Sequence, residues 1–243
     1  MDGVSFYCCQ AMGMDSTNQG IVWTVVVAAG AGRRFGGAKQ FCELAGVAVL
    51  DRAVLGAAKH STGVVVVVPS AKVGECSERF AALAKKVGAG HKVEWRVAGG
   101  GETRSASVRS GLSIVAPDAE VVLVHDAARP LASDALFVAV IEAIVAGADA
   151  AVPVLEVTDT LRFRSGDAID RAELVALQTP QAFRAELLRR VHEGCPEATD
   201  DVSLVFDVGG NVEFVVGERR NLKLTTPDDF VLAELLFADG SGS

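Results

Sequence analysis

A segment rich in glycine and arginine, residues 28–34, directly follows the first long apolar run of the chain. Small residues such as Gly30 and Gly32 let the backbone approach a ligand closely, and successive backbone N–H groups can bind phosphate oxygens. Arg34 and Lys39 add positive charge to the same stretch. A tight turn with solvated arginines is the alternative, but glycines and cations together at the end of an apolar run favour a phosphate-binding loop.

This loop matches neither of two common phosphate-binding motifs. A dinucleotide-binding fingerprint would have a third glycine at the position of Phe35, and an acidic residue near Pro69 after the second strand. A P-loop would have a lysine where this chain has Ala38, followed by Ser or Thr. The mismatches argue against a dehydrogenase and against a P-loop nucleotide hydrolase.

A second glycine-rich segment, residues 99–107, runs into a predicted helix. The backbone amides around Gly101 and Glu102, together with the Ser107 hydroxyl, could form hydrogen bonds to the edge of a base or to a ribose. A flexible turn followed by a helix cap is the alternative. This segment alone therefore leaves ligand binding open.

Asp126 follows a buried apolar run, residues 121–124, and Arg129 stands three positions later. A carboxylate at such a place is costly unless it has an ion-pair partner, a metal ion or a ligand hydroxyl. Arg129 could be that partner, which would make the pair purely structural. The neighbouring His125 is interpreted as a hydrogen-bonded core residue rather than as a catalytic base.

Polar residues interrupt the apolar pattern between positions 155 and 177. A Ser-Gly-Asp turn at 165–167 separates two short extended runs, which is typical of a β-hairpin that leaves the main sheet. Thr160 and Arg171 lie near the base of its two strands, and Lys223 is expected on a further short strand. Taken singly, these residues would pass as ordinary surface polarity.

The elements that must position these residues alternate between apolar strands and helices. This order predicts an α/β fold with a mainly parallel, twisted sheet and helices on both faces. Ligands bind such sheets at the carboxyl ends of the strands, where the segments above fall. Strands are expected at 21–29, 64–68, 93–97, 121–124, 150–154, 212–216 and 222–224, and helices at 50–60, 75–87, 104–114, 133–146 (with Ser133 as N-cap), 183–192 and 226–237 (with Thr226 as N-cap).

The composition describes an acidic protein with ample material for a core. Of the 243 residues 50% are hydrophobic and 22% are charged, and the formal net charge is −8. These values exclude intrinsic disorder and a broad basic surface for nucleic acid. No apolar run reaches the roughly 20 residues that span a bilayer, so no membrane partner is expected. The five cysteines have no C-x-x-C spacing, which argues against a zinc site or a disulfide framework and favours the cytoplasm.

Residues 1–20 have no hydrophobic periodicity and are expected to form a disordered N-terminal tail. Residues 21–243 contain no internal repeat and no linker long enough to separate two domains. A single domain with the hairpin at about 155–177 as an arm is therefore the expected organisation.

The motifs, taken in order, resemble those of one family, the 2-C-methyl-D-erythritol 4-phosphate cytidylyltransferases. The resemblance extends from about residue 25 to the last helix. One short segment would be weak evidence, whereas the ordered series is specific. The matching segments are AAGAGRRFGGAKQ, GGETRSASVRSGL, HDAARP, DTLR, DRAEL, QTPQAF, TDDVS and NLKLTTPDD.

The resemblance implies a Rossmann-like nucleotidyltransferase fold and a homodimer in which the hairpin arm is exchanged between subunits. It implies transfer of a cytidylyl group from CTP to 2-C-methyl-D-erythritol 4-phosphate, with Mg²⁺ as cofactor and pyrophosphate as the second product. It assigns catalysis to Arg34, Lys39, Arg171 and Lys223, CTP binding to Ala28, Ala29, Gly30, Gly32, Gly101, Glu102 and Ser107, acceptor binding to Asp126, Arg129, Thr160, Arg171 and Lys223, and metal binding to Asp126.

Two alternatives stay open. Ribitol 5-phosphate cytidylyltransferases share the fold and most of the motifs, but they tend to have Gly and Val at the positions of Ala29 and Ala128, which favours the methylerythritol enzyme. An inactive nucleotide-binding module is the other alternative. Such a module is expected to have lost Arg34, Lys39 or Lys223, and all three are present.

Overall fold

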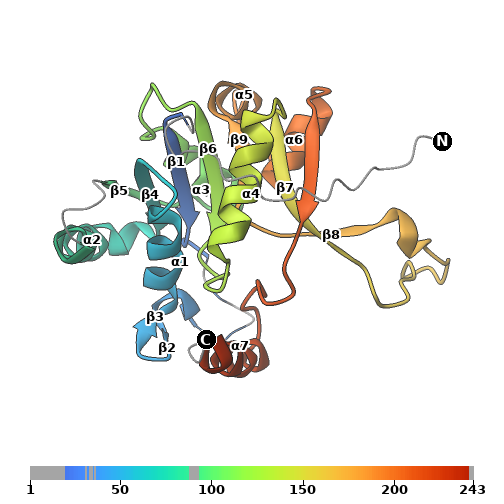
Figure 1. Cartoon of the computed structure of the whole chain (residues 1–243), viewed down its shortest axis with the longest axis horizontal. Coiled ribbons are helices and arrows are strands. Elements are labelled where there is room, and N and C mark those ends of the chain that lie inside the picture. The colour runs from blue at the N-terminus through green and yellow to red at the C-terminus, as the bar shows by residue number, and fades with distance from the viewer. Residues whose placement is uncertain (1–19, 31, 33–34, 36, 88–92, 241–243) are drawn as a thin grey trace.

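The computed structural model of the chain describes residues 20–240 except positions 31, 33–34, 36 and 88–92. Its centre is one large sheet with helices packed on it (Figure 1). The expected N-terminal tail falls almost entirely outside the described residues and stays a prediction. The strands of the sheet are β1 (Val22–Val27), β4 (Gly63–Val68), β5 (Glu94–Gly99), β6 (Val121–Asp126), β7 (Ala150–Glu156), β8 (Val175–Leu177), β9 (Gln181–Arg184) and β10 (Val212–Val216).

The sheet has eight strands in the order β10-β7-β9-β6-β1-β4-β5, with β8 paired to β7. β1 runs parallel to both β4 and β6, and the outer pairs β4–β5 and β7–β10 are also parallel. β9 is inserted antiparallel between β6 and β7. The mainly parallel sheet confirms the predicted α/β class.

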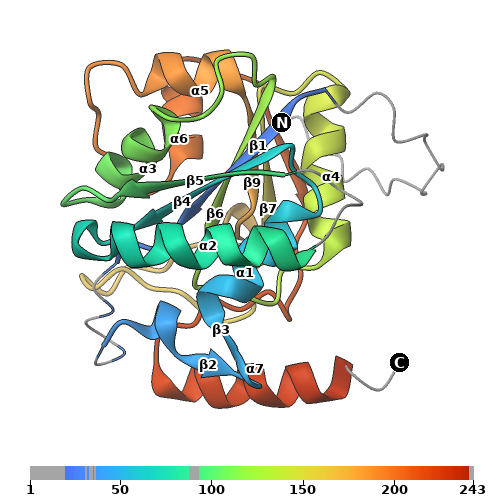
Figure 2. The ribbon, with the colours of Figure 1, turned by 90° about the vertical axis from the view of Figure 1, so that its left-hand side faces the viewer.

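Helices cover both faces of this sheet, as predicted (Figure 2). The valines of β4 alternate between the two faces: Val64 and Val66 pack in one apolar cluster, and Val65 and Val67 in the other. The first cluster includes residues of α1 (Val49–Ala58), α2 (Val73–Val87) and α4 (Asp134–Val145), and the second includes residues of α3 (Arg104–Leu112), α5 (Ala185–Val191) and α6 (Asp201–Asp207). Burial on both faces explains why the strand is a continuous valine run. The last helix of the described residues is α7 (Pro227–Gly240).

Two predicted helix starts are confirmed by their caps. The Ser133 hydroxyl accepts a hydrogen bond from the Leu136 amide at the start of α4. At the start of α7 the Thr226 hydroxyl accepts a hydrogen bond from the Asp229 amide at 3.4 Å, and the Asp229 carboxylate accepts from the backbone N–H groups of Thr225 and Thr226 at 2.7 Å each. Such bonds satisfy amides that have no partner within the helix.

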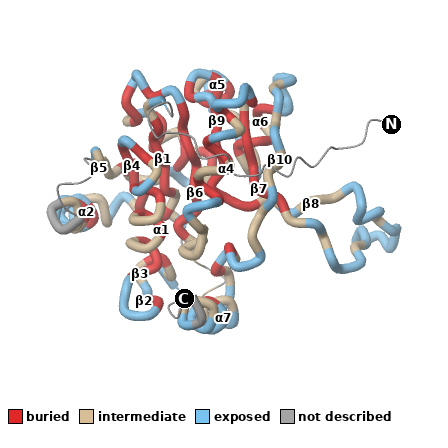
Figure 3. Tube along the Cα trace, viewed as in Figure 1, coloured by how far each residue is buried: buried red, intermediate tan, exposed pale blue. Residues whose placement is uncertain are grey.

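The hairpin arm leaves the sheet between β7 and β8 (Figure 1, right). β7 and β8 pair antiparallel at its base, and an isolated bridge joins Arg162 to Ala168 further out. Gly166 has a φ of +104°, a conformation that favours glycine, and forms the turn. Residues 157–173 are mostly exposed (Figure 3). The predicted arm is confirmed as a projection from the sheet.

The structure corrects the sequence-based elements at three places. Residues 222–224 do not form a strand. The neighbouring Asn221 is held by side-chain hydrogen bonds to Gln178 and Thr179 and not by the backbone hydrogen bonds of a sheet. The helix expected at 183–192 begins only at Ala185, because β9 occupies residues 181–184. Helix α6 and the small ribbon of β2 (Glu43–Leu44) and β3 (Val47–Ala48) were not predicted.

No helix within the described part of the chain is long and apolar enough to cross a membrane.

Candidate active site

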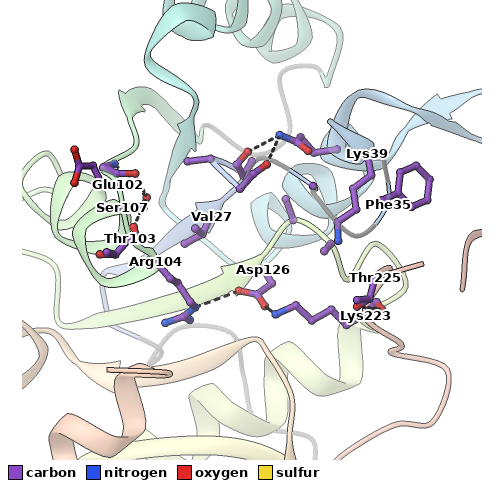
Figure 4. A pocket seen from close by; sticks show the side chains of 18 residues that line it. Val27, Phe35, Lys39, Glu102, Thr103, Arg104, Ser107, Asp126, Lys223 and Thr225 are labelled. Atoms are coloured by element: carbon purple, nitrogen blue, oxygen red, sulfur yellow. Dashed lines mark hydrogen bonds and ion pairs between the residues drawn. The ribbon is translucent and has the colours of Figure 1, made fainter. Parts of the chain in front are cut away.

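A cavity of about 420 Å³ opens at the carboxyl ends of β1, β5 and β6 (Figure 4). Four segments that are distant in the sequence meet there, which confirms that the motifs gather at one edge of the sheet. The described residues that line it are Val27, Ala28, Ala29, Gly30, Gly32, Phe35, Lys39, Gln40, Gly101, Glu102, Thr103, Arg104, Ser107, Asp126, Ala127, Ala128, Lys223 and Thr225.

The first loop, residues 28–40, is closed by a side chain that sequence analysis did not assign. The buried amide Nε2 of Gln40 donates to the carbonyl oxygens of Ala28 at 2.9 Å and Gly30 at 3.2 Å. Gly32 has a φ of +63°, and a Cβ there would lie 1.8 Å from the Gly37 carbonyl oxygen. The loop therefore requires a glycine at position 32. Arg34 lies outside the described residues.

The second loop, residues 99–107, lies against the first. A Cβ on Gly100 would lie 2.2 Å from the Cβ of Ala29, so the two backbones approach as closely as a glycine permits. The Ser107 hydroxyl donates to the Thr103 carbonyl at 2.9 Å and accepts from the Gly101 amide at 3.2 Å. Glu102 also lines the cavity. The residues predicted to bind a base or a ribose are thus brought together.

Asp126, at the end of β6, lies between two cations. Lys223 Nζ donates to Asp126 Oδ2 at 2.5 Å, and Arg104 Nε lies 3.6 Å from Oδ1. Burial alone would raise the pKa of Asp126, but the charges of Lys223 and Arg104 outweigh it and lower the pKa to about 2. Asp126 is therefore ionised at neutral pH. Sequence analysis predicted Asp126 and Lys223 here but did not single out Arg104.

The donor set fits a divalent cation only in part. Among the described residues there is no group of three or more His, Cys, Asp or Glu side chains that could hold a metal ion. Mg²⁺ is commonly bound by one or two carboxylates together with substrate phosphates and water. Asp126 fits as such a single carboxylate ligand, provided that the ion competes with Lys223 or Arg104 for one of its oxygens.

Arg129 does not line the cavity. Its guanidinium donates to the carbonyl oxygens of Asn221 at 2.7 Å and Leu177 at 3.2 Å. The amide of Gln178 also donates to the Asn221 carbonyl, at 3.2 Å. These bonds hold the segment before Lys223 against the end of β6. In this structure Arg129 braces the site, and a direct contact with an acceptor stays a prediction.

Thr160 and Arg171 are both exposed on the arm, away from the cavity of their own chain. The Arg171 guanidinium donates to the carbonyl of Thr158, also on the arm. The structure therefore brings together the two loops, Asp126 and Lys223, but not these two arm residues.

His125, next to Asp126, is a buried core residue, as predicted. Its Nδ1 lies 3.1 Å from the Thr179 hydroxyl, which also accepts a hydrogen bond from the Asp126 amide at 3.0 Å. Nδ1 is therefore the ring nitrogen that the Thr179 hydroxyl binds, and the direction of this hydrogen bond depends on the tautomer of the imidazole. Burial lowers the pKa of His125 from 6.5 to about 4. The imidazole is therefore neutral at pH 7.

We expect neutral His125 to make the fold sensitive to mild acid. Between pH 6.5 and about 4 the unfolded chain binds a proton at this residue that the folded chain does not. The contribution is fully present above pH 6.5, and up to about 3 kcal/mol of the unfolding free energy is lost as the pH falls toward 4. Urea unfolding at a series of pH values measures it. His125→Gln, which removes the titrating group, should show a flatter pH dependence, and equal slopes would contradict the assignment.

Solved structures of other proteins share this fold. The 4-diphosphocytidyl-2C-methyl-D-erythritol synthase of Anaerococcus prevotii superposes with a TM-score of 0.76 and 26% identity, over 91% of this chain and 100% of that one. The 2-C-methyl-D-erythritol 4-phosphate cytidylyltransferase of Thermus thermophilus has a TM-score of 0.68 and 35% identity, over 88% and 97%. The fold, with its site at the strand ends, defines a Rossmann-like α/β nucleotidyltransferase.

The sequence comparisons narrow this class to one family. The family model of 2-C-methyl-D-erythritol 4-phosphate cytidylyltransferase (IspD) matches residues 22–239. The enzyme of that name from Rubrobacter xylanophilus is 42% identical over 223 residues, which are 88% of this chain and 94% of the relative. The one from Rhodococcus jostii is 42% identical over 235 residues, 92% and 98% of the two chains. The chain belongs to the 2-C-methyl-D-erythritol 4-phosphate cytidylyltransferase family.

Proposed function

We propose that the protein transfers the cytidylyl group of CTP to 2-C-methyl-D-erythritol 4-phosphate, giving 4-diphosphocytidyl-2-C-methyl-D-erythritol and pyrophosphate. The observation that carries the proposal is the cluster of Lys39, Lys223 and Asp126 at a cavity between two glycine-rich loops, in a chain of this family. A phosphate oxygen of the acceptor attacks the α-phosphorus of CTP. The bond from that phosphorus to the bridging oxygen breaks, and pyrophosphate leaves.

The protein needs no nucleophile of its own for this reaction, because the acceptor phosphate already is one. Its task is to align the two substrates and to stabilise the charge that develops on the phosphates. The cytidine portion occupies the space between the loops, where Ala28, Ala29, Gly30, Gly32, Gly101, Glu102 and Ser107 are assigned to it. Lys39 and Arg34 are assigned to the triphosphate.

The acceptor is assigned to the cluster at the end of β6. Lys223 binds its phosphate, and Asp126 accepts hydrogen bonds from its hydroxyl groups. Asp126 is also the residue that would hold Mg²⁺, and a bound Mg²⁺ would neutralise charge on the triphosphate. Arg104, which lines the cavity beside Asp126, supports an anion-binding role for this region.

We further propose that the active form is a homodimer and that the arm of one subunit completes the site of the other. Thr160 and Arg171 are then supplied by the partner subunit, with Arg171 binding the acceptor phosphate. The support is that both residues lie on a projecting arm, exposed and away from their own cavity. A two-stranded hairpin of this kind is marginally stable alone, which favours a packing partner.

The proposal predicts release of pyrophosphate from CTP that depends on the acceptor. CTP, UTP, ATP and GTP are each supplied with 2-C-methyl-D-erythritol 4-phosphate and, separately, with ribitol 5-phosphate, and pyrophosphate is measured in a coupled assay. We expect turnover with CTP and the methylerythritol phosphate, and far less with the other nucleotides, because the base lies against a backbone-lined loop that can distinguish its hydrogen-bonding edge.

Each alternative has its own outcome in this assay. Preference for ribitol 5-phosphate would identify the other cytidylyltransferase activity. Equal turnover with UTP would contradict recognition of the cytosine edge. No turnover with any acceptor, together with measurable CTP binding, would favour an inactive nucleotide-binding module.

A further inference from the structure

A chain of ion pairs leads from the cavity into the interior of the protein. Arg104 Nε faces Asp126 Oδ1 at 3.6 Å, and Arg104 NH1 donates to Asp201 Oδ2 at 2.7 Å. The other carboxylate oxygen of Asp201 lies 3.0 Å from Nε2 of His192. Figure 4 shows Arg104 reaching toward Asp126 across the cavity. Asp201 and His192 stand behind it and are not among the lining residues.

Asp201 is the most enclosed member of this chain, with 1% of its surface exposed. Burial alone would raise the pKa of Asp201, but the hydrogen bond from His192 and the charge of Arg104 outweigh it and lower the pKa. Asp201 is thus held ionised inside the protein. Buried ion pairs are frequently no more stabilising than apolar residues of the same volume, so fold stability alone does not explain this pair.

Other contacts besides this ion pair attach α3 to the segment before Asp201. The Ser105 hydroxyl forms hydrogen bonds with both the carbonyl and the amide of Ala198, at 3.1 Å each. Arg109 NH1 donates to the Pro196 carbonyl at 2.6 Å. These contacts place the helix backbone. The hydrogen bond to Asp201 additionally fixes the position of one side chain, the guanidinium of Arg104.

We propose that Asp201, oriented by His192, is a positioning residue that limits the Arg104 guanidinium to its one 3.6 Å contact with Asp126, so that Asp126 stays available to Lys223 and to the substrates. This inference rests on the proposed function. A released guanidinium would turn its planar fork onto the Asp126 carboxylate and form a bidentate pair, the preferred arrangement of Arg with a carboxylate. Asp126 would then be occupied, and the acceptor would lose its alignment.

The test begins with Asp201→Asn, which keeps the side-chain volume but removes its charge. We expect kcat to fall roughly 10- to 100-fold, the scale for misplacing a reacting group by about one ångström. The Kd for CTP, measured by calorimetry, should change less than about twofold, because the nucleotide loops are held by other contacts. A residue that merely supports the fold would weaken CTP binding and kcat together.

A double-mutant cycle with Arg104→Gln separates positioning from general support. In the Arg104→Gln background, Asp201→Asn should cause no further loss of kcat, because the guanidinium that Asp201 positions is gone. Losses that multiply would overturn the proposal. If Asp201→Asn alone fails to fold, the kcat of Arg104→Gln is compared with that of the double variant, in which neither buried charge is left unpaired. Equal kcat values support the proposal, and a lower kcat of the double variant overturns it.

Asp200→Asn is the matched control. It removes the same charge one residue earlier, and asparagine retains the capping oxygen that accepts the Ser203 amide at 2.9 Å. Its kcat should stay close to that of the wild type. If Asp201→Asn also keeps the wild-type kcat while the wild type is active, the inference is wrong. An inactive wild type would instead refute the proposed function.

Discussion

Replacing Lys39 with alanine is expected to lower kcat by roughly 10²- to 10³-fold, the loss associated with removing one preorganised transition-state contact. Lys39 lies in a short 3₁₀ helix, Lys39–Phe41, that ends the first loop. Its Nζ donates to the carbonyl of Leu224, beside Lys223, so the lysine reaches from the first loop to the cluster at the strand ends. Steady-state kinetics with CTP and 2-C-methyl-D-erythritol 4-phosphate measure the effect.

We expect Lys39→Ala to lower kcat more than it weakens CTP binding, because the charge on the leaving pyrophosphate increases in the transition state. Lys59→Ala is a suitable control, since Lys59 is exposed and pairs with Asp134 at 3.0 Å outside the cavity. It should leave kcat unchanged. Near-wild-type turnover of Lys39→Ala would remove this residue from the mechanism.

A mixture of Arg171→Ala and Lys39→Ala chains is expected to regain activity that neither variant has alone. If the arm crosses to the partner, each site combines Lys39 of one subunit with Arg171 of the other. One of the two sites in each heterodimer then has both wild-type residues. The mixture, refolded or co-expressed with two different tags, is assayed for pyrophosphate release after tandem purification of the heterodimer.

The role of Arg171 across the dimer can be tested in two further ways. Arg171→Lys should impair use of the acceptor far more than CTP binding, because lysine lacks the planar fork that binds a phosphate through two hydrogen bonds. Heterodimers that form but show no activity would mean that Arg171 works within its own subunit or not at this site. Sedimentation that shows an active monomer would contradict the dimer itself.

The parts of the fold that local sequence patterns determine were predicted correctly. The valines of β4 are buried on both faces of the sheet, so a continuous apolar run sufficed to predict the strand. The glycine-rich loops follow strands of a parallel sheet, whose carboxyl ends share one edge, so their meeting at one cavity followed from topology.

The parts that depend on distant partners were not predictable in the same way. Arg104 and Asp201 are 97 residues apart, and no local pattern pairs them. The segment with Lys223 contains alternating apolar residues like a strand, but hydrogen bonds from Gln178 and Asn221 determine its conformation. The start of α5 was misplaced because a four-residue strand, β9, is too short to show a period of its own.

The hydrogen bonds of Gln40 have a consequence for how this family can vary. The side-chain amide of Gln40, at the end of the first loop, donates to the carbonyl oxygens of Ala28 and Gly30 near its start. It therefore joins the two ends of the loop. Because the closure entropy of a loop grows only slowly with its length, a change in length between Gly30 and Gln40 is expected to be tolerated as long as these two hydrogen bonds can form.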